Sequence, residues 1–145
     1  MTRKGKTIKY KKLHADARID APVYAGDVGY DIYSLDYYHI FPGERGIVRT
    51  GIALQIPTGY YASIDTRSSY GVNQGAQCHR GIIDTGYRGE ITVAVYNQGE
   101  RMLKVVKGDK VAQLIFHKIH KCSLEEVSSL ENSERGVKGM GSTGR

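Results

Sequence analysis

The chain has 145 residues, which is enough for one domain with a hydrophobic core of its own. Its 21 Lys and Arg residues outnumber 15 Asp and Glu residues, and the formal net charge of +6 favours an anionic partner such as nucleic acid or a phosphorylated small molecule. No apolar run approaches the roughly 20 residues of a membrane span, so we expect no contact with a membrane.

The chain begins with a basic arm. Much of the positive charge stands at Arg3, Lys4, Lys6, Lys9, Lys11 and Lys12. No apolar segment follows that would make this arm a secretory signal. Terminal basic arms are more often solvated than readers of bases, so we expect no requirement for nucleic acid. The two cysteines, Cys78 and Cys122, have no C-x-x-C spacing, which favours a reduced, cytoplasmic compartment.

Short β-rich runs alternate with turn signals, and no window shows helical periodicity longer than two turns. The predicted strands are residues 7–12, 30–35, 39–41, 47–56, 60–65, 91–97, 103–106 and 110–119. Many short strands at this spacing predict a single all-β domain of the sandwich, jelly-roll or barrel type. The one helix that we expect is a short turn after Arg67, with Ser68 or Ser69 as its cap.

Two features at residues 31 and 67–69 suit an anionic ligand. Asp31 lies among residues that look buried, so it needs an Arg, a metal-bound water or several N–H donors. Arg67-Ser68-Ser69 follows a predicted strand, and a guanidinium, two hydroxyls and free N–H groups form a phosphate nest. A helix cap beside a surface Arg explains the same three residues.

Residues 81–97 predict a β-hairpin. An apolar run ends at Asp84, a Thr-Gly turn follows, and residues 91–97 are rich in β-branched side chains. The hairpin would carry Asp84 and Tyr87 at its tip. An Asp at a turn often only hydrogen-bonds its own backbone, so this segment alone leaves a structural carboxylate open. Further along, Gln113 is the one polar residue in an apolar run and needs a partner, either structural or a ligand.

The apolar pattern stops after Leu130, so we divide the chain into a β domain, residues 1–130, and a flexible C-terminal arm, residues 131–145. The arm resembles a P-loop superficially, but Ser142 replaces the lysine and the segment ends the sequence, which argues against a P-loop NTPase. Its glycines let a backbone wrap around a phosphate, and Arg135 supplies donors, although a tail without function has the same composition. The His and Cys residues show no zinc spacing, so we expect Mg²⁺, held mainly by substrate phosphates.

Taken together and in order, five stretches resemble the trimeric dUTP diphosphatases (dUTPases). The stretches are residues 29–34 (GYDIYS), 67–69 (RSS), 81–89 (GIIDTGYRG), 108–115 (GDKVAQLI) and 135–144 (RGVKGMGSTG). The resemblance spans residues 28–144 and implies a jelly-roll or β-barrel-like (β-clip) homotrimer whose C-terminal arms are exchanged between subunits. It implies three active sites that hydrolyse dUTP to dUMP and pyrophosphate with Mg²⁺. This activity limits uracil incorporation into DNA and supplies dUMP for thymidylate synthesis.

The resemblance also implies roles for single residues. Asp84 would bind the 3′-hydroxyl and orient or deprotonate the water that attacks the α-phosphorus, and Tyr87 would pack on the deoxyribose and exclude a ribose. Backbone groups near Ile83 and Thr92 would pair with uracil. Asp31 would act behind Mg²⁺-bound waters or orient a neighbouring Arg, so it contacts the metal only indirectly. A cytoplasmic location is implied, or a nuclear or host-cytoplasmic one if the source is viral.

The full set of implied site residues is larger. The implied catalytic residues are Asp84, Ser68, Gln113 and Asp31. The implied substrate-binding residues are Arg67, Ser68, Ser69, His79, Ile82, Ile83, Asp84, Tyr87, Thr92, Gln113, Arg135, Met140, Gly141 and Ser142. Three residues depart from the family pattern: Met140 stands where the family usually has the Phe that stacks on uracil, Thr66 replaces a common Gly or Pro, and His79 replaces a frequent Asn.

Two alternatives remain open. The dCTP deaminases share the fold, but they carry a glutamate where this chain has Ala94, and they tend to have Phe in place of Tyr87. Alanine cannot shuttle a proton, so Ala94 argues against deamination. A non-enzymatic regulator that binds dUTP and switches a protein or nucleic-acid partner is the other alternative, and the complete set of catalytic positions argues against it.

Overall fold

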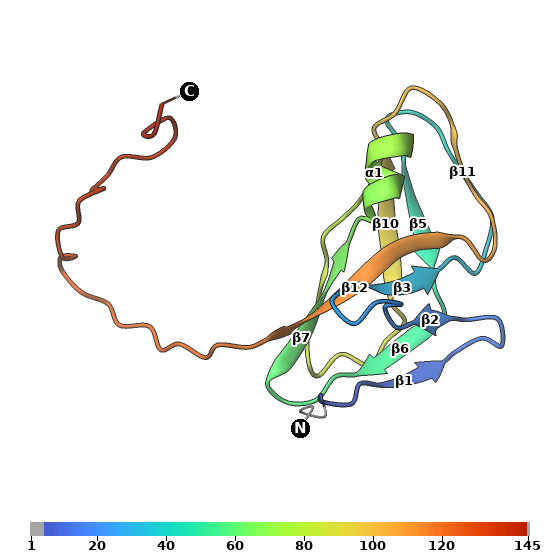
Figure 1. The fold of residues 1–145 in the computed structure, drawn as a ribbon, viewed down its shortest axis with the longest axis horizontal. Helices are drawn as coiled ribbons and strands as arrows, with labels where there is room; N and C mark the ends of the chain where they lie inside the picture. Colours follow the sequence, from blue (N-terminus) through green and yellow to red (C-terminus); the bar gives the residue numbers. More distant parts are fainter. Residues whose placement is uncertain (1–4, 145) are drawn as a thin grey trace.

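Strand β10 (Thr92–Asn97) shows how the sequence builds the sheets. Val93 and Val95 are buried while Thr92 and Tyr96 are exposed, so side chains alternate between core and solvent. The computed structural model describes residues 5–144, whose regular structure consists of β-strands and one short helix (Figure 1). The predicted all-β class with a single short helix is confirmed.

Antiparallel pairs join the strands into four sheets. The largest sheet has the order β2 (Ile19–Asp20), β3 (Tyr30–Tyr33), β12 (Lys110–Lys118), β7 (Tyr60–Asp65) and β9 (Ile82–Ile83). A second sheet has the order β5 (Arg45–Arg49), β10 and β8 (Ala76–Cys78). Two pairs complete the arrangement: β1 (Lys9–Lys12) with β6 (Ile52–Gln55), and β4 (Tyr38–Ile40) with β11 (Leu103–Val105). Within residues 5–144 these sheets do not close into a barrel.

One hydrophobic core connects the four sheets. Its fully buried aliphatic side chains are Ile32, Ile52, Ile56, Leu114, Val48, Val93, Val95, Val105 and Val111. Burial of one such side chain stabilises the fold by about 1.5–3 kcal/mol. Every sheet that supplies a buried side chain therefore contributes to the stability of the fold. The common core therefore fixes the relative positions of the loops that leave these sheets.

The helix α1 (Ser68–Gln74) begins after Arg67 as predicted, but its cap differs from the prediction. Arg67 itself is the N-cap residue, and no side chain makes a capping hydrogen bond. Ser68 and Ser69 lie in the first turn with exposed side chains. The predicted serine cap is therefore wrong, and the two hydroxyls face a cavity instead.

The segment predicted as one strand over residues 47–56 is two strands, because β5 ends at Arg49 and β6 starts at Ile52. The chain bends at Gly51, whose φ of 67° lies in the left-handed region that favours glycine. A Cβ there would lie 2.7 Å from Leu35 Cδ1, so the bend also packs tightly. An apolar run alone does not reveal such a bend.

The predicted hairpin over residues 81–97 is wrong in its pairing. Strand β9 pairs with β7 in the five-stranded sheet, whereas β10 pairs with β5 and β8 in the three-stranded sheet. Residues 84–91, called the 84–91 loop from here on, therefore connect two sheets rather than two neighbouring strands. A turn opens the loop, since the Tyr87 N–H donates to the Asp84 carbonyl over 3.1 Å.

The C-terminal segment extends beyond the sheets. Strand β12 ends at Lys118, and the described residues 120–144 are exposed and contain no helix or strand. Figure 1 shows this segment as a long arm that curves away from the β domain. The arm thus leaves the sheets before residue 131, and the boundary at that residue stays a prediction. Of the basic N-terminal residues, Lys9, Lys11 and Lys12 are exposed on β1, while Arg3 and Lys4 lie outside the described residues.

Within residues 5–144, no helix has the length and apolarity that crossing a bilayer requires.

Candidate active site

The predicted site residues fall into three groups at separate places. The first group surrounds a cavity of about 920 Å³ that we call the Arg67 pocket. The predicted residues that line it are Asp31, Arg67, Ser68, Ser69 and Gln113. They come from β3, the start of α1 and β12, so the fold brings together residues from three of the five stretches that the sequence singled out.

The sheet register explains why Asp31 and Gln113 meet. They are directly opposite each other on β3 and β12, so their side chains emerge on the same face. The Gln113 amide donates to the Thr66 carbonyl over 3.1 Å, which is the partner that a half-buried Gln needs. A Cβ on Gly29 would lie 2.0 Å from Gln113 Oε1, so glycine is required for this placement.

Asp31 is held between two cations. Arg67 Nε donates to Asp31 Oδ1 over 2.9 Å, and Lys110 Nζ lies 2.9 Å from Oδ2. The first contact is one of the three alternatives expected for Asp31, which were an Arg, a metal-bound water or several N–H donors. Sequence reasoning missed Lys110, although its charge on the fourth stretch was a visible signal.

A β-bulge brings Lys110 to this face. In a regular strand, Lys110 and Gln113 would point to opposite faces because they are an odd number of residues apart. The register shifts between Lys110 and Ala112, so that Lys110 pairs with Tyr33 while Gln113 pairs with Asp31. Tyr33 and Asp31 lie two residues apart and share a face, and Lys110 joins it.

The Arg67 pocket is also lined by Arg18 and Asp20, which sequence reasoning did not select. Arg18 pairs with Asp20 and lies over the Tyr33 ring, 4.6 Å from its centroid. Hydrogen bonds from Arg18 and then from Tyr33 lower the pKa of the Asp20 carboxyl. Burial, followed by the bond to Asp20, raises the pKa of Tyr33 to about 12. Arg18 is thus held at the pocket rim by fixed partners.

The second group of predicted residues surrounds a smaller cavity of about 210 Å³, called the Asp84 pocket. The predicted residues that line it are Ile82, Ile83, Asp84, Tyr87 and Thr92. Asp84 is exposed, and the Tyr87 side chain is half-exposed. A free carboxylate beside an aromatic ring and apolar walls suits a sugar and a base.

Asp84 and Arg67 lie at opposite ends of β7, and the wall of the Asp84 pocket extends along this strand to Ile64. Ile83 pairs with Ala62, and the Thr85 hydroxyl donates to the Tyr60 carbonyl over 2.5 Å, so Asp84 is level with the beginning of β7. Arg67 follows the end of that strand. Six residues at about 3.3 Å each separate the two levels by roughly 20 Å. The pockets are lined by different residues, so one chain does not bring Asp84 to the Arg67 pocket.

The third group lies apart from both pockets. His79 is exposed between β8 and β9, where its backbone N–H donates to the Ala94 carbonyl over 2.8 Å. Arg135, Met140, Gly141 and Ser142 lie on the exposed arm, and none of them lines either pocket. Arg135 Nε donates to the Lys138 carbonyl over 2.9 Å, so its partner is within the arm.

The donor set can be tested for a metal. Among residues 5–144, no three His, Cys, Asp or Glu side chains gather closely enough to hold an ion by themselves. Both oxygens of Asp31 already accept from a cation, although each keeps a lone pair for a water molecule. This arrangement suits a Mg²⁺ ion that is bound by phosphates and retains its waters.

Comparison with known proteins agrees with this geometry. The model of the dUTPase family matches residues 15–144. The deoxyuridine 5′-triphosphate nucleotidohydrolase of Clostridioides difficile is 40% identical over 139 residues, which cover 94% of this chain and 97% of that protein. The protein of the same name from Mus musculus is 38% identical over 141 residues, or 97% of this chain and 87% of that protein. The solved structure of the Staphylococcus bacteriophage 80alpha dUTPase with dUPNHPP has a TM-score of 0.90 at 27% identity, covering 97% of this chain and 100% of that chain.

Proposed function

This chain belongs to the dUTPase family, and from that premise we propose where and how its reaction takes place. The activity is that of a dUTP diphosphatase, which hydrolyses dUTP to dUMP and pyrophosphate. We place the active site where the Arg67 pocket of one subunit meets the Asp84 pocket of another. The observation that carries this proposal is the separation of roughly 20 Å between Arg67 and Asp84 along β7.

That separation is too large for one chain to complete the site. A general base must lie within about 2.6–3.2 Å of the water whose proton it takes, and the groups that hold the phosphate must surround the same phosphorus atom. Closed symmetric oligomers bring different surfaces of identical chains together. We propose a homotrimer, in which each of three interfaces joins one Arg67 pocket to one Asp84 pocket.

The Arg67 pocket binds the triphosphate in this proposal. The guanidinium of Arg67 and the hydroxyls of Ser68 and Ser69 donate to phosphate oxygens, and the Gln113 amide orients the α-phosphate. Asp31 positions Arg67 and Lys110 by pairing with both. Donors that are fixed before the substrate arrives need no reorganisation when charge develops in the transition state.

The charges of this pocket give a reason for Mg²⁺. Its charged lining residues are Arg18, Arg67 and Lys110 against Asp20, Asp27 and Asp31, so three positive charges meet three negative ones. Such a lining does not neutralise a triphosphate that carries close to four negative charges. Mg²⁺ bound to the phosphates would supply the missing positive charge and polarise the phosphoryl oxygens. Asp31 would contact such an ion only through water molecules.

The Asp84 pocket provides the nucleoside side of the site and the base. The Asp84 carboxylate accepts a proton from a water molecule while that water forms a bond to the α-phosphorus. The bond between the α-phosphorus and the bridging oxygen breaks, and pyrophosphate leaves with the bonding electrons. Tyr87 packs on the deoxyribose, and backbone groups of Ile82, Ile83 and Thr92 pair with uracil at the pocket wall.

The C-terminal arm acts as the cover in this proposal. Arg135 reaches the γ-phosphate, and Met140 covers the base with its polarizable thioether while Gly141 and Ser142 approach the phosphates. A closed cover excludes bulk water and strengthens each electrostatic contact. The exposure of the whole segment in the single chain is what such a role requires, since the arm must reach another subunit.

The experiment that tests the activity offers the purified protein dUTP, dCTP, dTTP and UTP with Mg²⁺ and identifies the products by chromatography. We expect dUMP and pyrophosphate from dUTP, and rates for the other three that are lower by orders of magnitude. Ammonia from dCTP would establish the deaminase alternative, and no pyrophosphate from dUTP would contradict the assignment. Ala94 argues for dUTP hydrolysis rather than deamination, because its methyl group has no acidic proton to transfer. Its backbone carbonyl already accepts from the backbone N–H of His79.

A further inference from the structure

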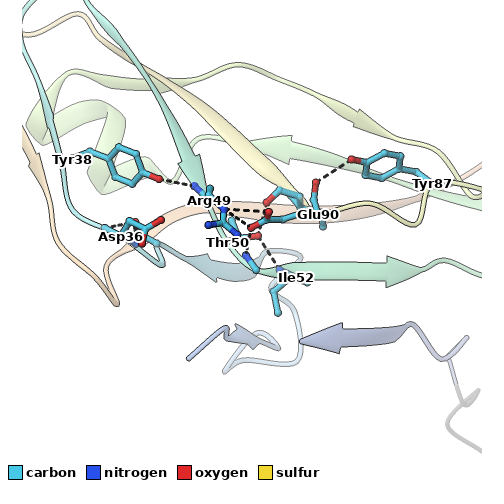
Figure 2. Close-up of polar contacts among 10 residues, drawn as sticks. Asp36, Tyr38, Arg49, Thr50, Ile52, Tyr87 and Glu90 are labelled. Carbon is cyan, nitrogen blue, oxygen red and sulfur yellow. Dashed lines mark hydrogen bonds and ion pairs between the residues drawn. The ribbon is translucent and has the colours of Figure 1, made fainter. Parts of the chain in front are cut away.

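Glu90 is the penultimate residue of the 84–91 loop and connects the loop to a different part of the fold (Figure 2). Its Oε1 accepts from the Gly51 N–H over 2.9 Å, and Arg49 Nε lies 3.3 Å from both carboxylate oxygens. Arg49 is the last residue of β5, and Gly51 lies in the turn between β5 and β6. The Glu90 side chain is 22% exposed and lines the Asp84 pocket, so this connection lies next to the nucleoside side of the site.

The β5–β6 turn is a rigid base for this connection. The Thr50 hydroxyl donates to the Ile91 carbonyl over 2.6 Å, and the Ile91 N–H donates to the Ile52 carbonyl over 2.8 Å. Thr50 is fully buried, and Gly51 packs so closely against Leu35 that it has no room for a Cβ. A backbone N–H fixed in this way holds the carboxylate that accepts from it.

Tyr87 is attached to the same end of the loop. Its hydroxyl donates to the Glu90 carbonyl over 3.0 Å, as Figure 2 shows. The ring lies over Gly89, where a Cβ would come within 2.4 Å of the Tyr87 hydroxyl oxygen and 2.7 Å of Cζ. Glu90 and Gly89 therefore position the ring of Tyr87, and the Gly51 N–H positions the Glu90 carboxylate.

We propose that Glu90 is a positioning residue for sugar discrimination, which rests on the function proposed above. By fixing the end of the 84–91 loop to the β5–β6 turn, Glu90 holds the Tyr87 ring where a deoxyribose fits and a ribose 2′-hydroxyl collides. Without this attachment only the Glu90–Ile91 peptide stays held, through the hydrogen bonds of Ile91, and residues 87–90 lose their side-chain connection to the β5–β6 turn. The ring then yields to the larger sugar, and UTP becomes a less disfavoured substrate.

The test compares kcat/KM for dUTP with kcat/KM for UTP in the full-length protein. In Glu90→Ala we expect the dUTP:UTP ratio to fall about 10-fold, because kcat/KM for dUTP drops more than that for UTP. In Glu90→Gln we expect a ratio within about 3-fold of the wild type, since the amide oxygen still accepts from the Gly51 N–H. Arg49→Ala is the matched control: it removes a half-exposed partner and leaves the Gly51 contact, so the ratio stays unchanged.

A merely structural role for Glu90 predicts a different result. Loss of folded protein lowers kcat/KM for both substrates by the same factor and leaves the ratio as it was, and that outcome overturns the proposal. If Glu90→Ala fails to fold, Gly89→Ala is used instead, because its added Cβ displaces the Tyr87 ring directly. An unchanged dUTP:UTP ratio in that variant would also contradict the proposal. Absence of dUTP hydrolysis in the wild type would instead contradict the proposed function, so the two failures are distinguishable.

Discussion

At the scale of single residues, burial decides the chemistry of Cys78. Its side chain is only 4% exposed, and the thiol donates to the Val111 carbonyl over 3.2 Å. Burial raises the pKa of this thiol to about 11, partly opposed by the hydrogen bond with Thr66. Because the folded pKa is raised, the folded state holds the proton more tightly than the unfolded chain does. The resulting stabilisation is fully present below the unfolded pKa of about 9 and is lost as pH rises towards 11.

We therefore expect the free energy of unfolding to fall between pH 8 and pH 10, and to fall by about 1 kcal/mol less in Cys78→Ala. Urea unfolding at several pH values and one fixed protein concentration measures both slopes. Tyr33 also has a raised pKa and adds to the loss at the upper end of this range in both proteins, so the difference between them isolates the thiol. Equal slopes would contradict the role assigned to burial.

The site residues show which contacts could be predicted from the sequence and which could not. Asp31 needed an Arg, a metal-bound water or several N–H donors on physical grounds, and Arg67 lies there. Lys110 was missed because strand parity places it on the face opposite Gln113, and only the bulge after it changes that. Glu90 was missed for a similar reason: its partners, Arg49 and Gly51, are about forty residues away, and no local pattern connects them.

At the scale of elements, strand existence was predictable but pairing was not. The strand over residues 60–65 is observed with the predicted bounds, because its residues are β-prone and bounded by turns. The two strands of the expected hairpin, β9 and β10, choose partners in different sheets. Pairing depends on which strands bury their apolar faces against each other, so strands that are neighbours in sequence need not pair with each other. The two-residue strands β2 and β9 are too short to show a period.

The arm is the element whose role is tested most simply. Deletion of residues 135–145 should lower kcat for dUTP by about 100-fold or more, because water stays in the site and the γ-phosphate loses Arg135. Sedimentation should show the same oligomer as the full chain, since residues 135–144 contribute no buried side chain to the β domain. Arg135→Ala is the control that removes only the guanidinium, and its effect should be smaller than that of the deletion.

Dissociation of the truncated protein would mean that the segment is structural, and unchanged turnover would mean that no cover is needed.

At the scale of the whole molecule, β7 keeps two half-sites apart. Arg67 follows its end and Asp84 is level with its beginning, so these two residues are roughly 20 Å apart along the strand. The common core supports the sheets that carry both residues. In the proposed assembly a second copy supplies the missing half, and the exposed arm reaches a third.

Mixing two inactive variants tests this central claim most directly. Asp84→Asn lacks the base, and Arg67→Ala lacks the phosphate contact, so each alone should hydrolyse dUTP slower than the wild type by orders of magnitude. The two variants carry different tags, are co-expressed in equal amounts, and are purified through both tags so that mixed oligomers are confirmed.

With random assembly, a site formed from two different subunits is intact when its base comes from an Arg67→Ala chain and its phosphate pocket from an Asp84→Asn chain. We therefore predict recovery of roughly a quarter of the wild-type rate in the unselected mixture, and a higher rate after both tags are selected. If each chain held a complete site of its own, every site would carry one defect. Confirmed mixed oligomers that hydrolyse dUTP no faster than either variant alone would contradict the account.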